Sequence, residues 1–239
     1  MQSLAGYAVV SCHVERPLDD DVWSAFQRLL ARRPAGFAIT PFLRPPADGE
    51  DEQRWLERAR RAAELAPLGH HTHWGGPSQA RPTAGVDAAR GVRAEAEWLR
   101  ARGVEPRFFC GGGWYLDAAL AQTLAQLGYV DCTATTFRQS YLAGDAPRLQ
   151  LAGPARLALP GGGSLLELPA THSLGMLARG LHRLDGLVHV HFHDWELVDR
   201  RRALALAALL RLLRLRRKPL SVAELAERAA DAPEVPWPS

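Results

Sequence analysis

Short apolar segments alternate along this chain with longer segments that have helical spacing. The apolar segments lie at residues 6–15, 36–43, 106–112, 129–135 and 186–197. When strands alternate with helices, each helix carries the chain back to the same edge of the sheet, so consecutive strands run parallel. The pattern therefore predicts an α/β fold with a parallel sheet.

The segments between these strands carry start and stop signals of helices. Apolar residues recur at helical spacing in 51–66, 86–103, 115–128, about 199–217 and 221–230. Gly103 and Gly128 are helix stop signals, and Ser221 with Glu224 forms a capping box. Helix and strand signals thus agree on the same alternating order.

The chain is predicted to be one domain. It has 239 residues and 47% hydrophobic content, which is enough for a sizeable core, and no internal repeat or glycine-rich linker divides it. Residues 1–239 are therefore taken as a single catalytic domain that ends in helices at about 199–230. Residues 136–170 are expected to be irregular apart from a turn at 160–164 between two short strands, and the proline-rich tail 231–239 is expected to be loosely ordered.

The charge pattern does not indicate a nucleic-acid partner. The net charge is +3, and basic residues are mostly interleaved with acidic ones, as on ordinary solvated helix faces. The exception is 200–219, a helix with an apolar face and arginines clustered at its ends. This helix either packs on the rest of the fold or makes peripheral contact with anionic lipid headgroups at a membrane.

The cysteines and the N-terminal segment indicate a cytoplasmic protein. Cys12, Cys110 and Cys132 are odd in number and far apart, so neither a disulfide framework nor a cysteine zinc site is indicated. Residues 1–15 have the pattern of a first strand rather than of a signal peptide, and no apolar stretch reaches the ~18 residues needed to span a bilayer.

Histidines are crowded at the end of one predicted strand. The segment LGHHTHWGG, residues 68–76, holds three of the nine histidines of the chain. Because side chains of a strand alternate between its two faces, His71 and His73 share one face, while His70 and Thr72 point the other way. This spacing predicts a pair of histidines aimed at one point.

Two other strands end in the same way. His13 and Glu15 share a face, as do His189, His191 and His193. Strand ends of an α/β barrel meet at its carboxyl rim, so these groups are expected to converge there. Histidine and carboxylate together suit zinc and related divalent ions, and Glu15, His71 and His73 would supply three ligands with an open position for water.

The order of the motifs resembles that of the polysaccharide deacetylases, the NodB-homology carbohydrate esterases of the family 4 type. The resemblance covers about residues 6–196, as five short motifs rather than as continuous similarity. It implies a distorted (β/α)7 barrel. Family members end their first strand in two acids, a general base and a metal ligand; here His13 stands at the base position and Glu15 at the ligand position.

The later motifs follow in the family's order. His71-Thr72-His73-Trp74 is similar to a His-x-His variant of the second motif, and residues 108–129 have the frame of the third, with Cys110 at its usual arginine position. His193-Asp194-Trp195-Glu196 matches the last motif, in which the histidine is the general acid.

The resemblance implies a metal-dependent hydrolase that removes an N-acetyl or related acyl group from a sugar or glycan-like substrate in a cytoplasmic biosynthetic pathway. Glu15, His71 and His73 would hold a divalent metal ion, with zinc preferred. His13 is the expected base and His193 the expected acid. The residues expected to contact the substrate or the oxyanion are Gly111, Gly112, Trp114 and Trp195.

Two other readings of the chain stay open. A histidine-x-histidine pair on a barrel strand also occurs in metal-dependent phosphoesterases and amidohydrolases, although usually on the first strand. The replacements His13 and Cys110 also fit a degenerate deacetylase homologue that binds a glycan without catalysis.

Overall fold

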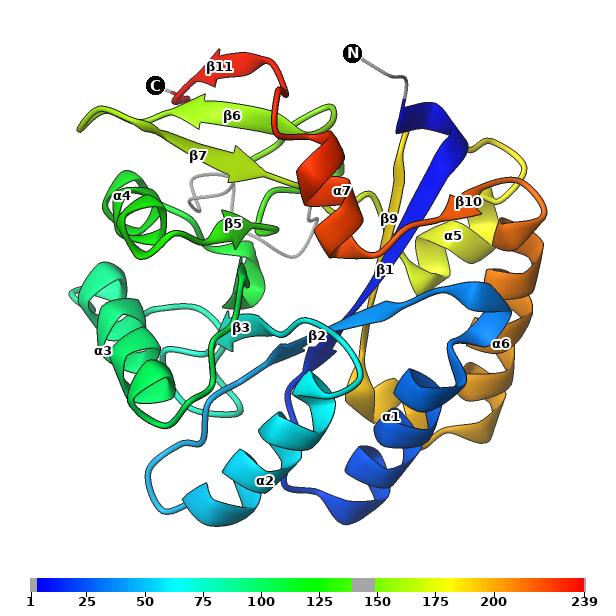
Figure 1. Ribbon diagram of the computed structural model, residues 1–239, viewed down its shortest axis with the longest axis horizontal. Helices are drawn as coiled ribbons and strands as arrows, with labels where there is room; N and C mark the ends of the chain where they lie inside the picture. Colours follow the sequence, from blue (N-terminus) through cyan, green and yellow to red (C-terminus); the bar gives the residue numbers. More distant parts are fainter. Residues whose placement is uncertain (1–3, 139–148, 239) are drawn as a thin grey trace.

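The structure is a computed structural model that describes residues 4–138 and 149–238, and a sheet of parallel strands forms its centre (Figure 1). Six strands pair side by side in the order β5-β4-β3-β2-β1-β9. Their bounds are β1 Tyr7–Val14, β2 Ile39–Leu43, β3 Gly69–Thr72, β4 Phe108–Gly111, β5 Val130–Asp131 and β9 Val188–His193. Every pairing among them is parallel, as the alternating sequence pattern predicts.

One continuous segment, residues 164–173, joins the two outer strands of this row. It contains β7 (Ser164–Glu167) and β8 (His172–Ser173). Its first part bonds to the β5 side, where Leu168 N–H donates to the carbonyl oxygen of Asp131. Its last part bonds to β9, where Thr171 N–H donates to the carbonyl oxygen of His189 and β8 runs parallel to β9. The parallel strands thereby close into a distorted barrel, in agreement with the predicted fold class.

Amphipathic helices cover the outside of the barrel (Figure 1). They are α1 Asp20–Arg32, α2 Glu52–Ala63, α3 Ala88–Ala101, α4 Ala118–Leu127 and α6 Arg200–Arg214. An aspartate caps the N-terminus of each, because its carboxylate accepts backbone N–H groups that have no partner within the helix. α4 ends at Gly128 with a left-handed φ of 76°, as the stop signal predicts.

Smaller elements lie around the barrel. The shorter helices are α5 Leu174–Gly180 and α7 Val222–Arg228, with 3-10 turns at Leu4–Gly6, Pro34–Gly36, Gly112–Trp114 and Asp194–Leu197. The shorter strands are β6 Ala155–Ala158, β10 Lys218–Pro219 and β11 Glu234–Pro236. β6 and β7 form the antiparallel pair expected around the turn at 160–164; residues 139–148 of the expected irregular region lie outside the described residues.

The C-terminal tail is more ordered than its proline content predicts. Residues Glu234–Pro236 form β11, which pairs in parallel with β6. Arg156 N–H donates to the carbonyl oxygen of Pro233, so the exposed edge of β6 supplies partners that an isolated proline-rich tail lacks. The expectation of a loosely ordered tail was wrong for this part of the chain.

Apolar side chains fill both faces of the sheet. Outside, Trp23 and Phe26 of α1 and Trp55 of α2 pack against strand residues such as Val10. Inside, Val9, Phe42 and Phe108 cluster with Val222 and Leu225 of α7. Among the described helices, none combines the length and hydrophobicity required to cross a bilayer.

Candidate metal-binding site

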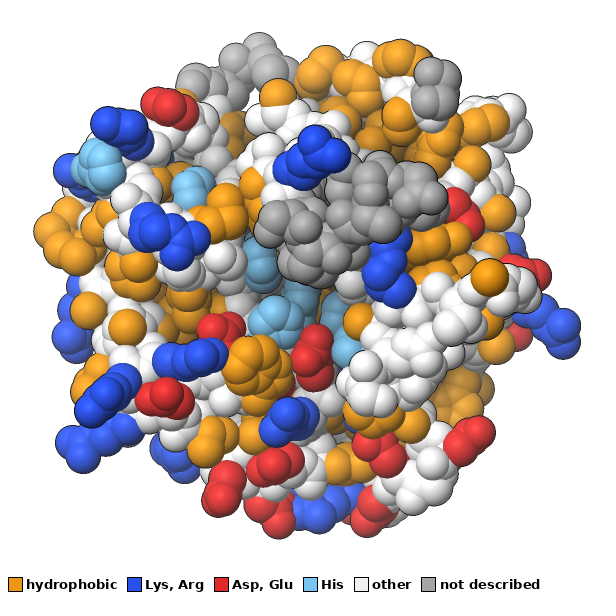
Figure 2. Space-filling view, turned by 180° about the vertical axis from the view of Figure 1, so that it is seen from behind, with side chains coloured by type: hydrophobic (Ala, Val, Ile, Leu, Met, Phe, Trp, Pro, Cys, Tyr) orange, Lys and Arg blue, Asp and Glu red, His pale blue; other side chains and the backbone are white. Residues whose placement is uncertain are grey.

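The carboxyl ends of β1, β3 and β9 bring the predicted histidines and Glu15 together. β1 lies next to β9 in the sheet, with His13 directly opposite His193. β3 joins the same row through β2. Figure 2 shows histidine side chains in pale blue at the floor of a hollow on this side of the molecule.

Three of these groups could hold a metal ion. Donor atoms of Glu15, His71 and His73 all lie within 4.8 Å of one another. Oε1 of Glu15 is 3.8 Å from Nε2 of His71 and 3.4 Å from Nε2 of His73. The two Nε2 atoms are 3.2 Å apart. The residues predicted as ligands therefore occupy one place, contributed by two strands.

Backbone carbonyl groups orient both imidazoles. Nδ1–H of His71 donates to the carbonyl oxygen of Cys110 at 2.8 Å, and Nδ1–H of His73 donates to that of Pro77 at 3.3 Å. With the proton on Nδ1, each Nε2 presents a lone pair toward Glu15. Two lone pairs and a carboxylate facing one another repel unless a positive charge lies between them, so the donor set fits a divalent cation.

The pKa shifts agree with this electrostatic picture. Burial raises the pKa of Glu15, but its electrostatic interactions with His71, His73 and His193 outweigh burial and hold it well below its usual range. Burial lowers the pKa of His71. The carboxylate is thus ionised and His71 tends to be neutral, which are the forms that bind metal.

His13 lies beside this group and not within it. Its imidazole stacks on that of His71 with ring centroids 4.5 Å apart, and its Nε2 is 3.5 Å from Sγ of Cys110. His13, His71 and Cys110 form a second group that could hold an ion. Burial raises the pKa of Cys110 well above its usual value, which disfavours the thiolate that metal binding requires. The Glu15 group is the better candidate.

The two histidines assigned to proton transfer have pKa values shifted in opposite directions. Burial, followed by the neighbouring His71, lowers the pKa of His13 well below its usual value. Burial also lowers that of His193, but the carboxylates of Glu196 and Glu15 outweigh burial and raise it. The side chain of His193 is 29% exposed, and its Nε2 lies 3.6 Å from Oε1 of Glu15. A neutral His13 can accept a proton, and a protonated His193 can donate one.

The residues after His193 support the site from one side. Trp195 stacks on His193 with ring centroids 5.5 Å apart, and its Nε1–H donates to Oε2 of Glu15 at 3.2 Å. Asp194 accepts the backbone N–H of Arg16, next to Glu15, at 2.9 Å. Burial raises the pKa of Asp194 to about 6. Trp195, predicted as a substrate residue, instead orients the carboxylate of Glu15, a candidate metal ligand.

The glycine-rich turn after β4 is packed tightly against β3. An ideal Cβ at Gly112 would lie 2.5 Å from the carbonyl oxygen of Ala80 and 3.0 Å from Cδ2 of His73. Gly111 N–H donates to Oγ1 of Thr133 at 2.7 Å, so it has a partner within the protein. Of the two glycines predicted to stabilise an oxyanion, Gly111 lines the cavity over the histidine cluster with its N–H already bonded, and Gly112 is not among the residues that line this cavity.

Trp114 forms a wall of the site and not an open stacking surface. Only 7% of it is exposed. Its ring lies 5.5 Å from that of His13 and 4.7 Å from that of His191. Its φ of 58° is unusual for a residue with a side chain, and strain of this kind often occurs at functional sites.

The period-two prediction for β3 is confirmed. His70 and Thr72 point away from His71 and His73, toward α3, where both contact Oε2 of Glu95 at 2.8 and 2.6 Å. Likewise His189 lies deeper on the same face of β9 as His191 and His193, with its Nε2 3.0 Å from Oγ of Ser11.

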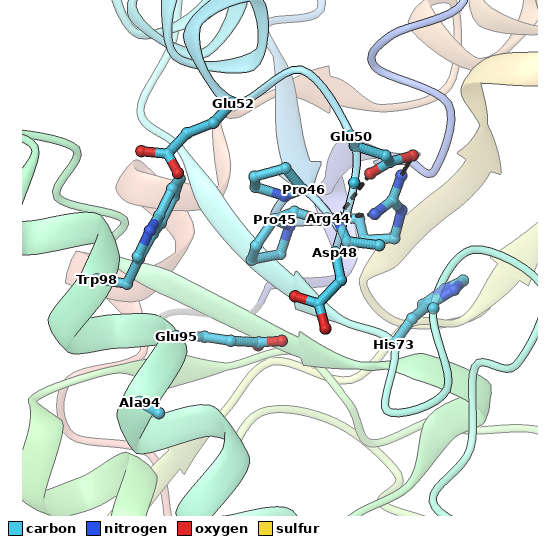
Figure 3. A pocket seen from close by; sticks show the side chains of 13 residues that line it. Arg44, Pro45, Pro46, Asp48, Glu50, Glu52, His73, Ala94, Glu95 and Trp98 are labelled. Carbon is cyan, nitrogen blue, oxygen red and sulfur yellow. Dashed lines mark hydrogen bonds and ion pairs between the residues drawn. The ribbon is translucent and has the colours of Figure 1, made fainter.

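Two cavities are lined by residues of the Glu15, His71 and His73 group and differ in charge. The cavity over the histidine cluster has a volume of about 570 Å³, and Glu15, Arg138 and Arg179 are its charged lining residues. The other has about 680 Å³ and is rich in carboxylates: Asp48, Glu50, Glu52 and Glu95. Figure 3 shows Asp48 and Glu95 projecting toward its interior, while Glu50 is paired with Arg44.

Sequence reasoning missed several residues that line the first cavity. They are Phe137, Arg138, Met176 and Arg179, which follow β5 and β8. Their position after strands of the barrel is the signal that could have found them, but β8 was not predicted as a separate strand.

Comparisons with known proteins show similarity in structure and not in sequence. No family model matches the chain, and no curated protein matches it by sequence. A protein from Mycobacterium smegmatis described as a candidate polysaccharide deacetylase superimposes with a TM-score of 0.72 at 16% identity, covering 100% of this chain and 94% of that one. A mutant of a carbohydrate esterase family 4 pseudoenzyme with restored activity gives 0.58 at 12% identity, covering 96% and 69%.

The same fold also occurs in an enzyme of different chemistry. A 4-alpha-glucanotransferase from Thermococcus litoralis gives a TM-score of 0.62 at 12% identity, covering 100% of this chain and 42% of that one. The fold alone therefore does not fix the reaction. The chain has the polysaccharide deacetylase fold of the NodB-homology, carbohydrate esterase family 4 type, as the order of its motifs predicted.

Proposed function

We propose that this protein is a metal-dependent hydrolase that removes an N-acetyl or related acyl group from a sugar or glycan-like substrate. The observation that carries the proposal is the convergence of Glu15, His71 and His73 within 4.8 Å, with His13 and His193 beside them. The deacetylase fold supports the same reaction class.

Glu15, His71 and His73 would hold the metal ion, and zinc suits this set of nitrogen and oxygen donors. When bound there, a divalent ion polarises the acyl carbonyl and lowers the pKa of water. Trp195 keeps Glu15 oriented through its Nε1–H, and the carbonyl oxygens of Cys110 and Pro77 keep the two imidazoles oriented.

His13 and His193 divide the proton transfers. His13, neutral because it is buried, accepts the proton of the attacking water at Nε2 or Nδ1. His193, whose pKa is raised by Glu196 and Glu15, donates a proton to the leaving amine nitrogen.

We further propose that the reaction belongs to a cytoplasmic biosynthetic pathway. The supporting observation is that Cys12, Cys110 and Cys132 are unpaired and buried. Unpaired thiols are typical of proteins from reducing compartments.

Metal analysis combined with an amidase screen tests the proposal. The wild type should contain about one zinc or similar ion per chain and should release acetate from at least one N-acetyl sugar. The double variant His71→Ala, His73→Ala should lose both properties. The matched control is His182→Ala, which removes an exposed histidine that belongs neither to the candidate metal-binding groups nor to the lining of the cavity over them.

Other outcomes would replace the proposal. If neither protein binds metal after reconstitution, the hydrolase mechanism is wrong. If metal is bound but no amide is cleaved, the chain is a binding protein with a deacetylase fold. If phosphate is released from p-nitrophenyl phosphate while N-acetyl sugars stay intact, the protein is a phosphoesterase.

A further inference from the structure

The cavity over the histidine cluster has two arginines in its wall. Arg138 follows β5, and Arg179 lies near the end of α5. Both segments follow barrel strands on the side where Glu15, His71 and His193 line the same cavity. A molecule bound at the histidines is thus within the same 570 Å³ space as both guanidinium groups.

Neither guanidinium group has a polar partner among the described residues. Within residues 4–138 and 149–238, Arg138 and Arg179 take part in no hydrogen bond or ion pair. Elsewhere, arginines near acids are paired, as Arg44 is with Glu50 at 2.9 Å and Arg102 with Glu52 at 2.7 Å. Two unpaired guanidinium groups facing one cavity form a site for an anion, because their N–H groups match carboxylate and phosphate oxygens.

The acid in this cavity does not cancel that charge. Among its described lining residues Glu15 is the sole carboxylate, and it is engaged with His71 and His73. An anion bound near Arg138 and Arg179 would therefore meet net positive charge.

The neighbouring cavity would repel the same anion. Asp48 and Glu95 line it and point into it in Figure 3, while Glu50 and Glu52 are paired with Arg44 and Arg102. The opposite charge of the two cavities gives a charged substrate one favourable orientation.

We propose that the substrate carries a carboxylate or phosphate group that Arg138 and Arg179 bind while its acyl amide lies at Glu15, His71 and His73. This inference rests on the proposed function for the amide end. Phe137 and Met176 add apolar wall to the same cavity, which suits the face of a sugar ring.

Matched pairs of neutral and charged sugars test the anion site. The probes are N-acetylglucosamine, its 6-phosphate and its 6-carboxylate, so the phosphate and carboxylate arms are separate. For the preferred charged sugar, kcat/KM should fall about tenfold for Arg138→Gln or Arg179→Gln and more for the double variant. For the neutral sugar it should stay within about threefold. Arg90→Gln, an exposed arginine of α3, is the control and should change neither.

Failure of this inference can be separated from failure of the proposed function. If all three sugars are cleaved equally well and the arginine variants change nothing, the anion site is wrong and the hydrolase stands. Titration with inorganic phosphate covers the opposite case, in which no amide is cleaved. If the wild type binds phosphate and the double variant loses this binding at equal metal content, the result supports the anion site alone. If phosphate does not bind, or binds both proteins equally, the anion site is wrong.

A second surface is independent of this site. Large hydrophobic residues are strongly exposed at five described positions, and four of these lie in or next to α6: Val198, Leu204, Leu212 and Leu215. Leu206, Leu210 and Leu213 are the buried residues of the same helix and face the protein. α6 therefore presents an apolar stripe on the side opposite to its packed face.

A groove between α1 and α6 continues this apolar stripe. It has a volume of about 600 Å³, with Leu29, Leu197 and Leu204 among its lining. Arg28, Arg32, Arg200 and Arg211 also line it, and no acidic residue does among those described. These four guanidinium groups have no hydrogen-bond or ion-pair partner within the described residues.

We infer that the apolar stripe of α6 and the neighbouring groove between α1 and α6 together bind the surface of an anionic phospholipid bilayer. Apolar side chains surrounded by unpaired arginines match the boundary between acyl chains and negatively charged headgroups. A basic partner surface is disfavoured, because no described residue of the groove is acidic.

Sedimentation with vesicles tests this surface without any enzyme assay. The wild type should bind phosphatidylglycerol vesicles, bind phosphatidylcholine vesicles weakly and dissociate at high salt. Arg28→Gln with Arg211→Gln should weaken binding by about fivefold per arginine, and Leu212→Asn with Leu215→Asn should also weaken it. Arg61→Gln with Arg90→Gln removes the same charge from α2 and α3 and should have no comparable effect.

Three results would overturn the membrane assignment. The first is that the wild type binds neither phosphatidylglycerol nor phosphatidylcholine vesicles. The second is that the two pairs of arginine variants weaken binding equally. The third is that the protein forms a dimer that the leucine variants dissociate. The last result would assign the face to a second copy of this chain.

Discussion

The indole Nε1–H of Trp195 donates a 3.2 Å hydrogen bond to Oε2 of Glu15, whose other oxygen, Oε1, faces His71 and His73. Partners of this kind orient a metal ligand, and their loss typically costs about 10–100-fold in metal affinity. Trp195→Phe should therefore weaken zinc binding by that factor in a chelator competition assay, while an aromatic ring still stacks on His193. Trp98→Phe, a change of the same type in the acidic cavity, should leave the affinity unaltered; equal affinities for all three proteins would contradict the role of Trp195.

Because of the position of His13, we expect its replacement to lower the activity without loss of bound metal. Its imidazole lies beside His71 but outside the Glu15 group. His13→Ala should lower kcat by about 10²–10⁴-fold, the usual contribution of a general base, at unchanged metal content. If metal is lost instead, and Cys110→Ala loses it as well, the ion belongs to the His13, His71 and Cys110 group.

Gly112 predicts a steric effect on stability. A Cβ there would lie 2.5 Å from the carbonyl oxygen of Ala80, and the backbone of a closed barrel has little room to yield. Gly112→Ala should lower the free energy of unfolding by about 1–3 kcal/mol, measured by urea denaturation. Gly153→Ala is the control, because a Cβ at that position has no atom within 4 Å. Equal stability of the two variants would show that the turn can shift.

Asp131 and Glu167 predict a pH-dependent stability. They are paired across β5 and β7 and are fully buried. Burial and the charge of Asp131 raise the pKa of Glu167 well above its usual value. A carboxyl group whose pKa is raised in the folded state contributes stability below its unfolded pKa, and that stability is lost as the pH rises through the folded pKa.

Glu167→Gln removes this titration, because an amide does not ionise. Between about pH 5 and pH 9 the unfolding free energy of the wild type should fall more steeply than that of the variant, by up to about 1.4 kcal/mol per pH unit. The control variant Glu105→Gln, at an exposed position, should show the same pH dependence of the unfolding free energy as the wild type. Parallel curves for all three proteins would mean that Glu167 does not titrate in this range.

Local sequence patterns predicted the elements that depend on local rules. The apolar runs became β1, β4 and β9, and alternation along β3 placed His71 and His73 on one side and His70 on the other. Aspartates and Gly128 set the helix ends for the same reason, since capping involves neighbouring residues.

Features that depend on distant partners were not predictable. β11 exists because β6 offers it an edge, and its proline-rich sequence alone indicates a loose tail. The N–H of Gly111 donates to Thr133, which lies 22 positions further along the chain. This N–H is therefore not free to bind an oxyanion, although the run of glycines suggested that it would be. Arg138 and Arg179 share a cavity because two loops meet in space, which no spacing along the chain reports.

The order in which the site residues occur along the chain has a consequence for biosynthesis. Glu15 and Trp195 are 180 positions apart, and β1 needs β9 as its neighbour. During translation, β1 to β4 emerge first and can pair with one another, but the edge of β1 stays open until β9 has left the ribosome. The geometry around Glu15 is thus completed only after β9 and the turn at Asp194–Leu197 have been made, when most of the helices on the outside of the barrel have had time to dock.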